Sequence, residues 1–575
     1  MPKLLTSLLL LCIIHNSFAQ YQFRGLVKDG NGISLKNVLI TLQSSKRTIR
    51  SDSYGKFNIP SSKRSDTLIF TLEKYTSSIL PVYVNQFLAV ELQTLQINAE
   101  RKFHLNSITK DNSLQKQYWT YANESYTNLV PNPFVTTIQS PGVSFSPNTN
   151  KASYSNVRRF LNMNERVPPD AVRIEEMLNY FNFNYVAPKQ DHIFNCVSYL
   201  AKCPWNKSNN LLMINISAKM VNLENVSPCN LVFLIDASGS MDLPNKLPIL
   251  KSGFRHLVKN LRSIDTVSIV TYGATIRVVI DGASGDEKDK IIRAIESIQP
   301  DGETPGEAGI RAGYKVAGKH YIECGNNRII LATDGDFNVG KTSEKDLENL
   351  IADQEQNGIY LTCLGVGIGN YKDSKLFTLA QKGNGNFAYL DNEQESERVL
   401  VTEFTQTLYS VADNVTFQLS LDRSFVSSYR LIGYDNRIEA LKDTSSTVEG
   451  GEIGSGHSLS ILIEVVPGTN IFNGNDIGNM VINYQLPGTQ IIKKIHFACS
   501  GILLPDDSAS IKIKKAAGIA MLGLKLKQVP NVMISWKDLE AFTKENFKTD
   551  AYFDKEFVSM VGKAKKIYGH KKTAN

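Results

Sequence analysis

The sequence predicts a multidomain protein of α/β plus β class. A central doubly wound, mostly parallel sheet is flanked by an N-terminal β-sandwich and by a C-terminal β domain with a helical tail. Three observations predict this class. The length of 575 residues exceeds what one hydrophobic core organises. Buried strands alternate with amphipathic helices between Asn230 and Ala412, the pattern of a parallel sheet. Short alternating apolar runs between turn residues, typical of antiparallel sheets, lie on both sides.

The composition is that of a folded, soluble protein. Hydrophobic residues make up 42% of the chain and charged residues 21%, near the averages for globular domains. The formal net charge of +7 is small for this length and is spread along the chain. A dedicated nucleic-acid surface would need a concentrated basic patch, so we expect no nucleic-acid partner.

The first residues have the pattern of an export signal. Lys3 precedes an apolar run from Leu8 to Ile14, and Ser17-Phe18-Ala19 forms a small-x-small cleavage pattern. We therefore expect a cleaved signal peptide and an exported protein, located in the periplasm, at the cell surface or in the medium. No later apolar run reaches the roughly 20 residues that a bilayer requires, so we expect no transmembrane segment after cleavage. Peripheral association with the envelope stays open.

The cysteines of the mature chain leave the disulfide pattern open. An exported location permits disulfides, but the spacing of six cysteines does not give their connectivity. Cys196 and Cys203 are sterically the easiest pair. Cys363 lies in the apolar run YLTCLGVG, where a buried free thiol is expected.

Acidic and hydroxyl side chains follow the strands of the central region. Asp236, Ser238 and Ser240 form a D-x-S-x-S turn after the apolar run NLVFLID, Thr304 lies in DGETPGEAG, and Asp334 ends RIILATD. Ligands of open α/β sheets bind beyond the carboxyl ends of the strands, so we expect these side chains to converge. Oxygen ligands suit a hard divalent cation, Mg²⁺ first, with Mn²⁺ or Ca²⁺ as alternatives. An isolated D-x-S-x-S could be only a turn and helix cap, but separate loops supply the remaining oxygens.

This pattern resembles the metal-ion-dependent adhesion site (MIDAS) of the von Willebrand factor A domain, which has a D-x-S-x-S loop, a distant Thr and a distant Asp. The resemblance implies a Rossmann-like fold. It also implies that Ser238, Ser240 and Thr304 coordinate the metal directly, while Asp236 and Asp334 bind it directly or through water. Hydroxyl-rich ligation leaves the charge of the cation poorly neutralised. An acidic side chain of a protein partner would then be the missing ligand.

Further motifs extend the resemblance over most of the mature chain, roughly from Phe145 to Tyr568. SYSNVRRFL, PPDAVRIEEMLNYF, GNNRIILATDGDFNVG, KGNGNFAYLD and YRLIGYDNR resemble the YfbK-type family of bacterial A-domain proteins. That family tends to have F-S-I-D-V-D-T-A-S-Y where this chain has FSPNTNKASY, so Asn148 and Asn150 replace acids. Near the N-terminus, the pattern G-x-V-x-D with S-D-S-Y-G-K-F resembles the carboxypeptidase regulatory-like domains of exported bacterial proteins.

These patterns divide the chain into six parts. They are a signal peptide (1–19), a carboxypeptidase regulatory-like β-sandwich (20–96), a linker (97–124), a family-specific N-terminal region (125–227), a von Willebrand factor A domain (228–412) and a C-terminal β and helical domain (413–575). The last part contains two lysine-rich stretches, Lys512 to Lys527 and Lys563 to Lys572. They indicate either solvated helix faces or contact with an anionic membrane.

Two motifs favour catalysis instead of binding. Residues 335–342, GDFNVGKT, match the phosphate-binding loop G-x-x-x-x-G-K-T, but Asp336 would place a negative charge among phosphates. His320-x-x-Glu323 has the spacing of a zinc pair without a third ligand in context. No nucleophile, base and orienting acid can be assembled from linear motifs.

The function predicted from the sequence is therefore binding. We expect that the protein is not an enzyme. We expect it to be an exported, metal-dependent adhesion or scaffold module that holds an acidic side chain of a protein partner. The alternative is a metal-assisted hydrolase or NTPase that uses the same edge of the sheet. In a third interpretation the metal only stabilises loops.

Overall fold

The computed structural model describes residues 21–569 except 30–33, 74, 85, 93–123, 125, 148–149, 184, 190–191, 223–225, 303–305, 324, 336–343, 369–370, 404–408, 436–449, 488, 506–510, 531 and 548–550. The predicted signal peptide and all but one residue of the predicted linker lie outside the described residues. The chain divides into two compact units, residues 1–102 and 103–575. Each unit is described by itself.

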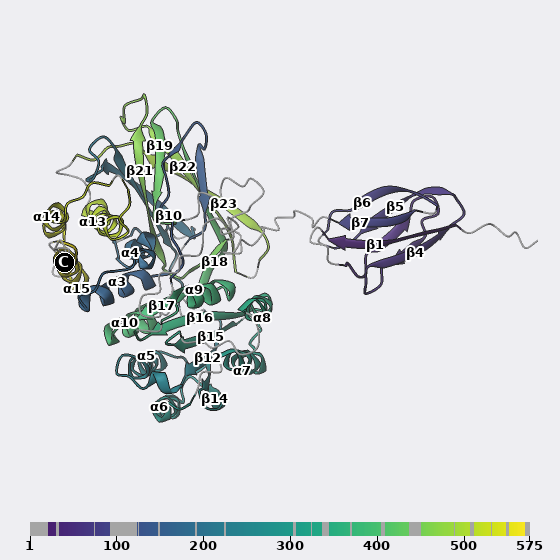
Figure 1. Ribbon diagram of the computed structural model, residues 1–575, viewed down its shortest axis with the longest axis horizontal. Helices are drawn as coiled ribbons and strands as arrows, with labels where there is room; N and C mark the ends of the chain where they lie inside the picture. The colour runs from purple at the N-terminus through teal and green to yellow at the C-terminus, as the bar shows by residue number, and fades with distance from the viewer. Residues whose placement is uncertain are drawn as a thin grey trace, which may run out of the picture. The chain divides into compact units, whose positions relative to one another are not determined.

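The first unit is a β-sandwich (Figure 1). One sheet has the strand order β4-β1-β7 and the other β3-β2-β5-β6. Alternate side chains, among them Phe23, Phe57 and Phe70, fill the space between the sheets, as the period of two along each strand requires. The strands are β1 (Tyr21–Asp29), β2 (Leu39–Leu42), β3 (Thr48–Arg50), β4 (Lys56–Ser61), β5 (Ser65–Thr71), β6 (Ser78–Tyr83) and β7 (Phe87–Leu92).

The second unit contains a six-stranded sheet of order β14-β13-β12-β15-β16-β17. All neighbouring pairs are parallel except β13 with the edge strand β14. The inner strands are buried along nearly their whole length and mostly apolar, because both faces of the sheet are covered. The strands are β12 (Cys229–Asp236), β13 (Thr266–Tyr272), β14 (Arg277–Ser284), β15 (Asn326–Thr333), β16 (Ile359–Val366) and β17 (Phe387–Leu390).

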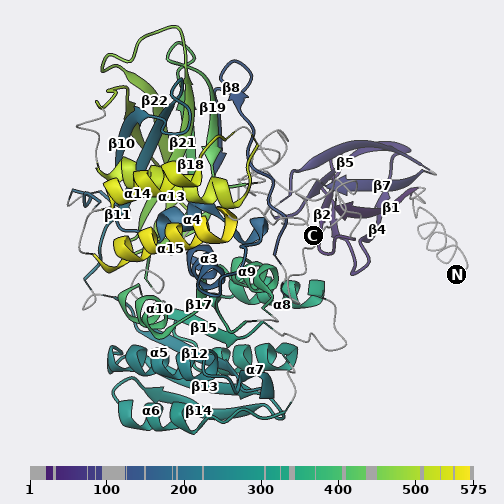
Figure 2. The ribbon, with the colours of Figure 1, turned by 60° about the vertical axis from the view of Figure 1, so that its left-hand side comes forward.

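Helices cover both faces of this sheet (Figure 2). On one face lie α5 (Leu247–Lys259), α6 (Lys288–Ser297), α10 (Glu393–Glu397) and the π-helical turn η4 (Arg398–Thr402). On the other lie α7 (Gly306–Lys319), α8 (Glu344–Gln356) and α9 (Asp373–Lys382). The predicted α/β plus β class, with a doubly wound central sheet, is confirmed.

A second sandwich lies beside this α/β layer in the same unit. Its sheets have the orders β10-β11-β21-β19-β8 and β20-β18-β22-β23, with β9 paired to β18. Residues before and after the central sheet, which the sequence analysis assigns to separate parts, thus supply strands to the same sheets. The strands are β8 (Val135–Thr136), β9 (Gly142–Phe145), β10 (Phe194–Lys202), β11 (Asn210–Ala218), β18 (Ser410–Leu421), β19 (Val426–Ile432), β20 (Gly451–Gly454), β21 (Ser458–Pro467), β22 (Asp476–Gln485) and β23 (Ile492–Ser500).

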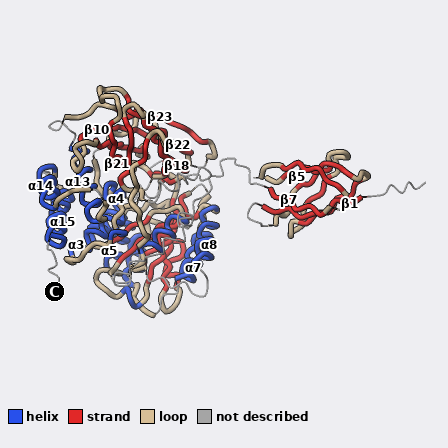
Figure 3. Tube along the Cα trace, turned by 45° about the horizontal axis from the view of Figure 1, so that its top comes forward, coloured by secondary structure: helices blue, strands red, loops and turns tan. Residues whose placement is uncertain are grey.

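Helices from both ends of the unit pack on the outer face of the first of these sheets (Figure 3). They are α3 (Ala152–Asn162), α4 (Ile174–Asn179), α13 (Ile511–Leu526), α14 (Trp536–Asn546) and α15 (Tyr552–Gly569). Most of α13 is buried, and an added Cβ at Gly523 would lie 2.7 Å from Ile174, so α13 and α4 pack closely. Lys515 of α13 pairs with Asp554, and Lys527, directly after the helix, pairs with Asp435. Four of the five lysines in residues 512–527 are half-buried and Lys527 is buried, so they do not form a fully solvated helix face; contact with an anionic membrane stays a prediction.

Buried ion pairs join the α/β layer around the central sheet to these helices. The guanidinium of Arg158 on α3 contacts Asp391 and Glu395, 2.5 and 2.8 Å away, and Glu556 of α15 at 3.0 Å. Arg173 binds Asp373 of α9 at 2.7 Å. Each guanidinium is at most 7% exposed, and a buried charge without its partner is costly.

The described cysteines are free thiols. Cys196 and Cys203, the sterically easiest pair in the sequence, form no disulfide in the described part of the chain. Cys363 is fully buried on β16, as expected, and burial raises the pKa of its thiol well above the usual value.

Candidate metal centre

The predicted acidic side chains meet at the carboxyl-terminal edge of the central sheet. Asp236 ends β12, and Asp334 directly follows β15. These two strands are parallel neighbours, with Ile235 opposite Ala332. The two carboxylates are 0% and 2% exposed, so they form the buried floor of the site.

The D-x-S-x-S turn adds hydroxyl oxygens above this floor. The backbone N–H of Ser238 donates to Asp236 Oδ1 at 2.9 Å, which closes the turn before the 3₁₀ helix Gly239–Met241. Ser240 Oγ donates to Asp334 Oδ2 at 2.7 Å and lies 3.1 Å from Ser238 Oγ. Four of the five predicted ligands are therefore in one network.

Thr333 adds a hydroxyl that the sequence analysis missed. Its Oγ1 donates to Asp236 Oδ2 at 2.8 Å, so both oxygens of this carboxylate accept hydrogen bonds. The pKa of Asp236 is raised to about 6, mainly by burial and in part by the nearby Asp334 carboxylate. Thr333 directly precedes Asp334 in the sequence, and this adjacency was the available signal.

Lys246 is the second residue that the sequence analysis missed. Its Nζ lies 2.8 Å from Asp334 Oδ2, and the residue is 5% exposed. Its aliphatic stem packs against Gly367, where an added Cβ would be 2.5 Å from Lys246 Cε. Gly367 has a φ of +83°, which favours glycine. A lysine between the D-x-S-x-S turn and the first amphipathic helix was the only sequence signal.

The fifth predicted ligand, Thr304, lies outside the described residues, so its place in the site stays a prediction. The chain just before it is close to the D-x-S-x-S turn. The carbonyl oxygen of Gly302 accepts a hydrogen bond from Gly239 N at 3.0 Å, and Asp301 N donates to the Ala237 carbonyl at 2.7 Å.

The donor set fits a hard divalent cation. Apart from the Lys246 ammonium, the converging side chains present carboxylate and hydroxyl oxygens, which Mg²⁺, Mn²⁺ and Ca²⁺ prefer over softer ligands. Ser240 is exposed while Asp236, Ser238 and Asp334 are buried, so the site opens to solvent on the side of Ser240. Such a geometry leaves room for a ligand from another molecule.

The catalytic alternatives gain no support from the described residues. His320 Nε2 lies 2.6 Å from Asp281 Oδ1, and the same carboxylate binds Lys319. Within the described residues no group of three His, Cys, Asp or Glu side chains forms around His320, so the zinc pair gains no third ligand of these types. Seven of the eight residues of the phosphate-loop motif at 335–342 lie outside the described residues. Asn150, which the sequence analysis noted as a departure from the expected YfbK-type pattern, accepts a hydrogen bond from Phe387 N at 2.8 Å.

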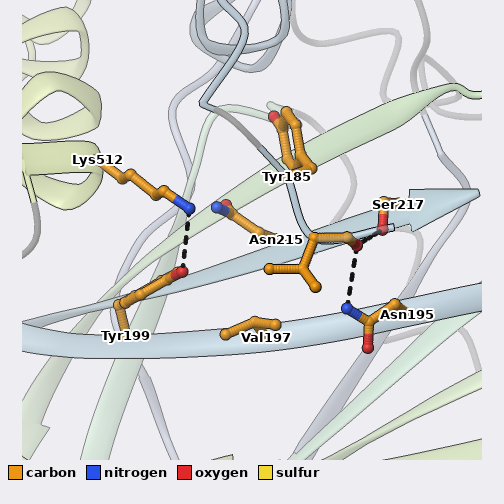
Figure 4. A pocket seen from close by; sticks show the side chains of 8 residues that line it. Tyr185, Asn195, Val197, Tyr199, Asn215, Ser217 and Lys512 are labelled. Atoms are coloured by element: carbon orange, nitrogen blue, oxygen red, sulfur yellow. Dashed lines mark hydrogen bonds between the residues drawn. The ribbon is translucent and has the colours of Figure 1, made fainter. Parts of the chain in front are cut away.

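A small hollow on the outer face of β10 and β11 does not form a ligand site (Figure 4). Its empty volume is about 180 Å³ with open solvent included, below the roughly 300 Å³ at which ligand pockets begin. Asn195 Nδ2 and Ser217 Oγ both donate to the Val186 carbonyl. Lys512 Nζ lies 3.5 Å from Tyr199 Oη.

Comparison with known families decides the nature of the central domain. The family model of the von Willebrand factor type A domain matches residues 230–405. The chain carries a von Willebrand factor type A domain. A model described as von Willebrand factor matches residues 120–213, and one for the C-terminal part of the uncharacterized protein YfbK matches 406–473. The predicted resemblance to YfbK-type proteins is thereby confirmed. Von Willebrand factor type A domains are typically protein-interaction modules. The matched ranges begin at residue 120, so the likeness of residues 20–96 to carboxypeptidase regulatory-like domains stays a prediction.

Individual relatives cover parts of the chain. The uncharacterized protein YfbK of Escherichia coli is 39% identical over 348 residues, 59% of this chain and 60% of that protein. Inter-alpha-trypsin inhibitor heavy chain H2 of Mus musculus is 28% identical over 204 residues, 34% of this chain and 21% of its own. The solved von Willebrand factor type A structure from Catenulispora acidiphila is 15% identical. It covers 64% of this chain and 88% of its own, with a TM-score of 0.39.

One further observation concerns membranes. Among the described residues, no helix combines the length and the apolar character that crossing a bilayer requires.

Proposed function

We propose that this protein is an exported adhesion or scaffold module that binds a protein partner through a divalent cation. The cation, Mg²⁺ first and Mn²⁺ or Ca²⁺ as alternatives, would be held by Asp236, Ser238, Ser240, Thr304 and Asp334. An acidic side chain of the partner would complete its coordination. One observation carries the proposal: buried carboxylates and hydroxyls from two strand-end loops converge beside the exposed Ser240.

The charge of the site supports an acidic partner. Two carboxylates face the site, and Lys246 already neutralises one of them. A bound divalent cation would leave positive charge uncompensated, and a carboxylate from a partner is the natural ligand to balance it. Protein binding is also the usual role of the A-domain family that the central domain matches. We therefore propose a binding protein and not an enzyme.

Export is supported by the sequence of the first twenty residues alone. Lys3, the apolar run and the small-x-small pattern are those of a signal peptide. Periplasm, cell surface and medium remain open as final locations.

Calorimetric titration of Mg²⁺, Mn²⁺ and Ca²⁺ into the purified protein tests the metal site. We expect saturable binding in the wild type and its loss in Asp236→Ala, because that carboxylate contributes the central buried charge of the network. Asp353→Ala is the matched control. Asp353 is an exposed carboxylate on α8, so its removal should leave the binding isotherm unchanged.

Three outcomes would contradict this proposal. Folded wild-type protein that takes up none of the three cations would remove the proposed mechanism. Turnover of a nucleotide or peptide that falls in Lys341→Ala or His320→Ala would favour the alternative, a metal-assisted hydrolase or NTPase. If metal changes only the melting temperature and no cation-dependent partner is captured, the site would be structural.

A further inference from the structure

Lys246 provides an internal positive charge beside the candidate metal site. Its ammonium group contacts Asp334 Oδ2 at 2.8 Å, and the side chains are 6% and 2% exposed. The same carboxylate oxygen accepts the hydrogen bond from Ser240 Oγ. A buried ion pair of this kind is shielded little by solvent. The electrostatic effect of Lys246 therefore acts directly on the proposed ligands.

The position of Lys246 is fixed by its surroundings. It directly precedes α5, and its backbone N–H donates to the Leu243 carbonyl at 3.0 Å. Its methylene groups lie against the backbone of Gly367, which directly follows β16. Since any side chain at residue 367 would occupy the space of the lysine stem, the glycine makes room for this conformation.

The charges around the site give Lys246 a specific role. Asp236 and Asp334 contribute two negative charges and Lys246 one positive charge, so the side chains together carry about one negative charge when both acids are ionised. A divalent cation would turn this into a net positive charge. Without Lys246 the two carboxylates alone would balance the cation.

We propose that Lys246 is the counter-cation of Asp334 and sets the affinity of the site for divalent cations. In the metal-free protein it keeps the buried Asp334 compensated. When a cation binds, Lys246 repels it and leaves the site positively charged, which favours completion by an acidic side chain of a partner. This inference rests on the proposed metal site and adds a residue that controls it.

Variants of Lys246 test the proposal by stability and affinity together. Lys246→Met removes the charge and keeps an aliphatic stem, and Lys246→Gln keeps a hydrogen-bond donor without charge. We expect both variants to bind Mn²⁺ at least about tenfold more tightly than the wild type in calorimetry, because a nearby like charge is gone. In the metal-free state we expect a lower melting temperature, because the buried Asp334 carboxylate loses the positive charge of Lys246, and saturating Mn²⁺ should restore it.

Lys259→Met is the matched control. Lys259 is exposed at the other end of the same helix, roughly 20 Å away at 1.5 Å per residue. It should change neither Mn²⁺ affinity nor metal-free stability. Equal or weaker Mn²⁺ binding by both Lys246 variants would overturn the inference while leaving the metal site intact. A wild type that binds no cation would overturn the proposed function as well. A melting temperature lowered equally with and without Mn²⁺ would assign Lys246 a merely structural role.

Discussion

The central A domain and the sandwich beside it are formed from the chain in opposite ways. Residues 229–402 follow one another through the six-stranded sheet, and each helix lies close in sequence to the strands that it covers. In the sandwich, β11 pairs with β21, about 240 residues later in the chain. The Nδ2 of Asn132 donates to the Gly433 carbonyl at 2.7 Å, 301 residues away. The A domain can thus form from local segments, whereas the sandwich needs both ends of the unit.

The strongest test of this comparison is to destroy the sandwich and ask whether the A domain survives. Ile461 is fully buried between the sheets of the sandwich and lies opposite Ile214. Ile461→Asp should cost about 4 kcal/mol or more, because an unpaired carboxylate enters an apolar core. We expect limited proteolysis with mass spectrometry to show digestion of the sandwich and a resistant fragment that spans the A domain.

The same carboxylate at an exposed position of the sandwich is the control. Gln418 on β18 is exposed, so Gln418→Asp should leave the digestion pattern unchanged. Equal digestion of A domain and sandwich in Ile461→Asp would mean that they unfold as one cooperative unit, and the comparison would be wrong.

A second test concerns the buried ion pairs that connect the two regions. Arg158→Met leaves Asp391, Glu395 and Glu556 without their shared partner. We expect a loss of about 3 kcal/mol in the free energy of unfolding, measured by urea denaturation, because breaking a buried pair strands the opposite charge. The exposed Arg166, which lies over the ring of Tyr568 at 5.4 Å, is the control. If Arg158→Met costs no more than Arg166→Met, the network does not hold the regions together.

The smallest expected effect is a dependence of stability on pH near the same junction. His457 precedes β21 and is buried, and burial lowers its pKa to about 3; Lys151 lowers it further, and Glu403 opposes the shift. A histidine with a depressed pKa contributes stability above pH 6.5, the pKa in the unfolded chain, and loses it as the pH falls toward 3. His457→Gln should therefore remove a loss of about 1.4 kcal/mol per pH unit below 6.5.

Urea denaturation of the wild type and of His457→Gln between pH 7 and 5 measures this difference, which should reach about 2 kcal/mol at pH 5. Other acidic groups change the stability of the two proteins equally, so only the difference between the curves reports on His457. Parallel curves would show that this histidine accepts a proton in the folded state without penalty.

The comparison also explains which elements the sequence predicts. Residues 231–235, LVFLI, are apolar without a break because β12 is covered on both faces, and this pattern was sufficient to predict a central strand. Helix α7 was not identified, because glycines lower the helix propensity of GEAGIRAGYKVAGK. The structure gives one reason for them: an added Cβ at Gly309 would lie 2.7 Å from the ring of Tyr272.

The sandwich was predicted only as separate β-rich segments. Runs such as LLMINISAKMV and SLSILIEVV indicate buried strands, but hydrophobic alternation does not specify which strand pairs with which. The partner of β11 depends on the whole tertiary structure, including the helices that cover its outer face. A single sequence carries no signal for a contact at that separation.

The candidate site was predicted in its acids and hydroxyls but not in its lysine. Asp236, Ser238 and Ser240 share one turn, and Asp334 follows a strand with the same pattern, so topology alone brings them to one edge. Lys246 and Asp334 are 88 residues apart in the sequence. A loop brings the lysine to the site, and the sequence of a loop has no periodic pattern from which its path could be predicted. The contact became visible only from the coordinates.

The sandwich cannot close until the residues on both sides of the A domain have been synthesised. β11 ends at Ala218 and β18 begins at Ser410, so roughly 190 residues must be synthesised before the first half meets the second. At about 5 to 20 residues per second, that interval is on the order of 10 to 40 seconds. During it, β10 and β11 expose apolar faces, and the A domain itself is complete only after residue 402. A factor that shields exposed strands during synthesis would therefore matter most for residues 194–218.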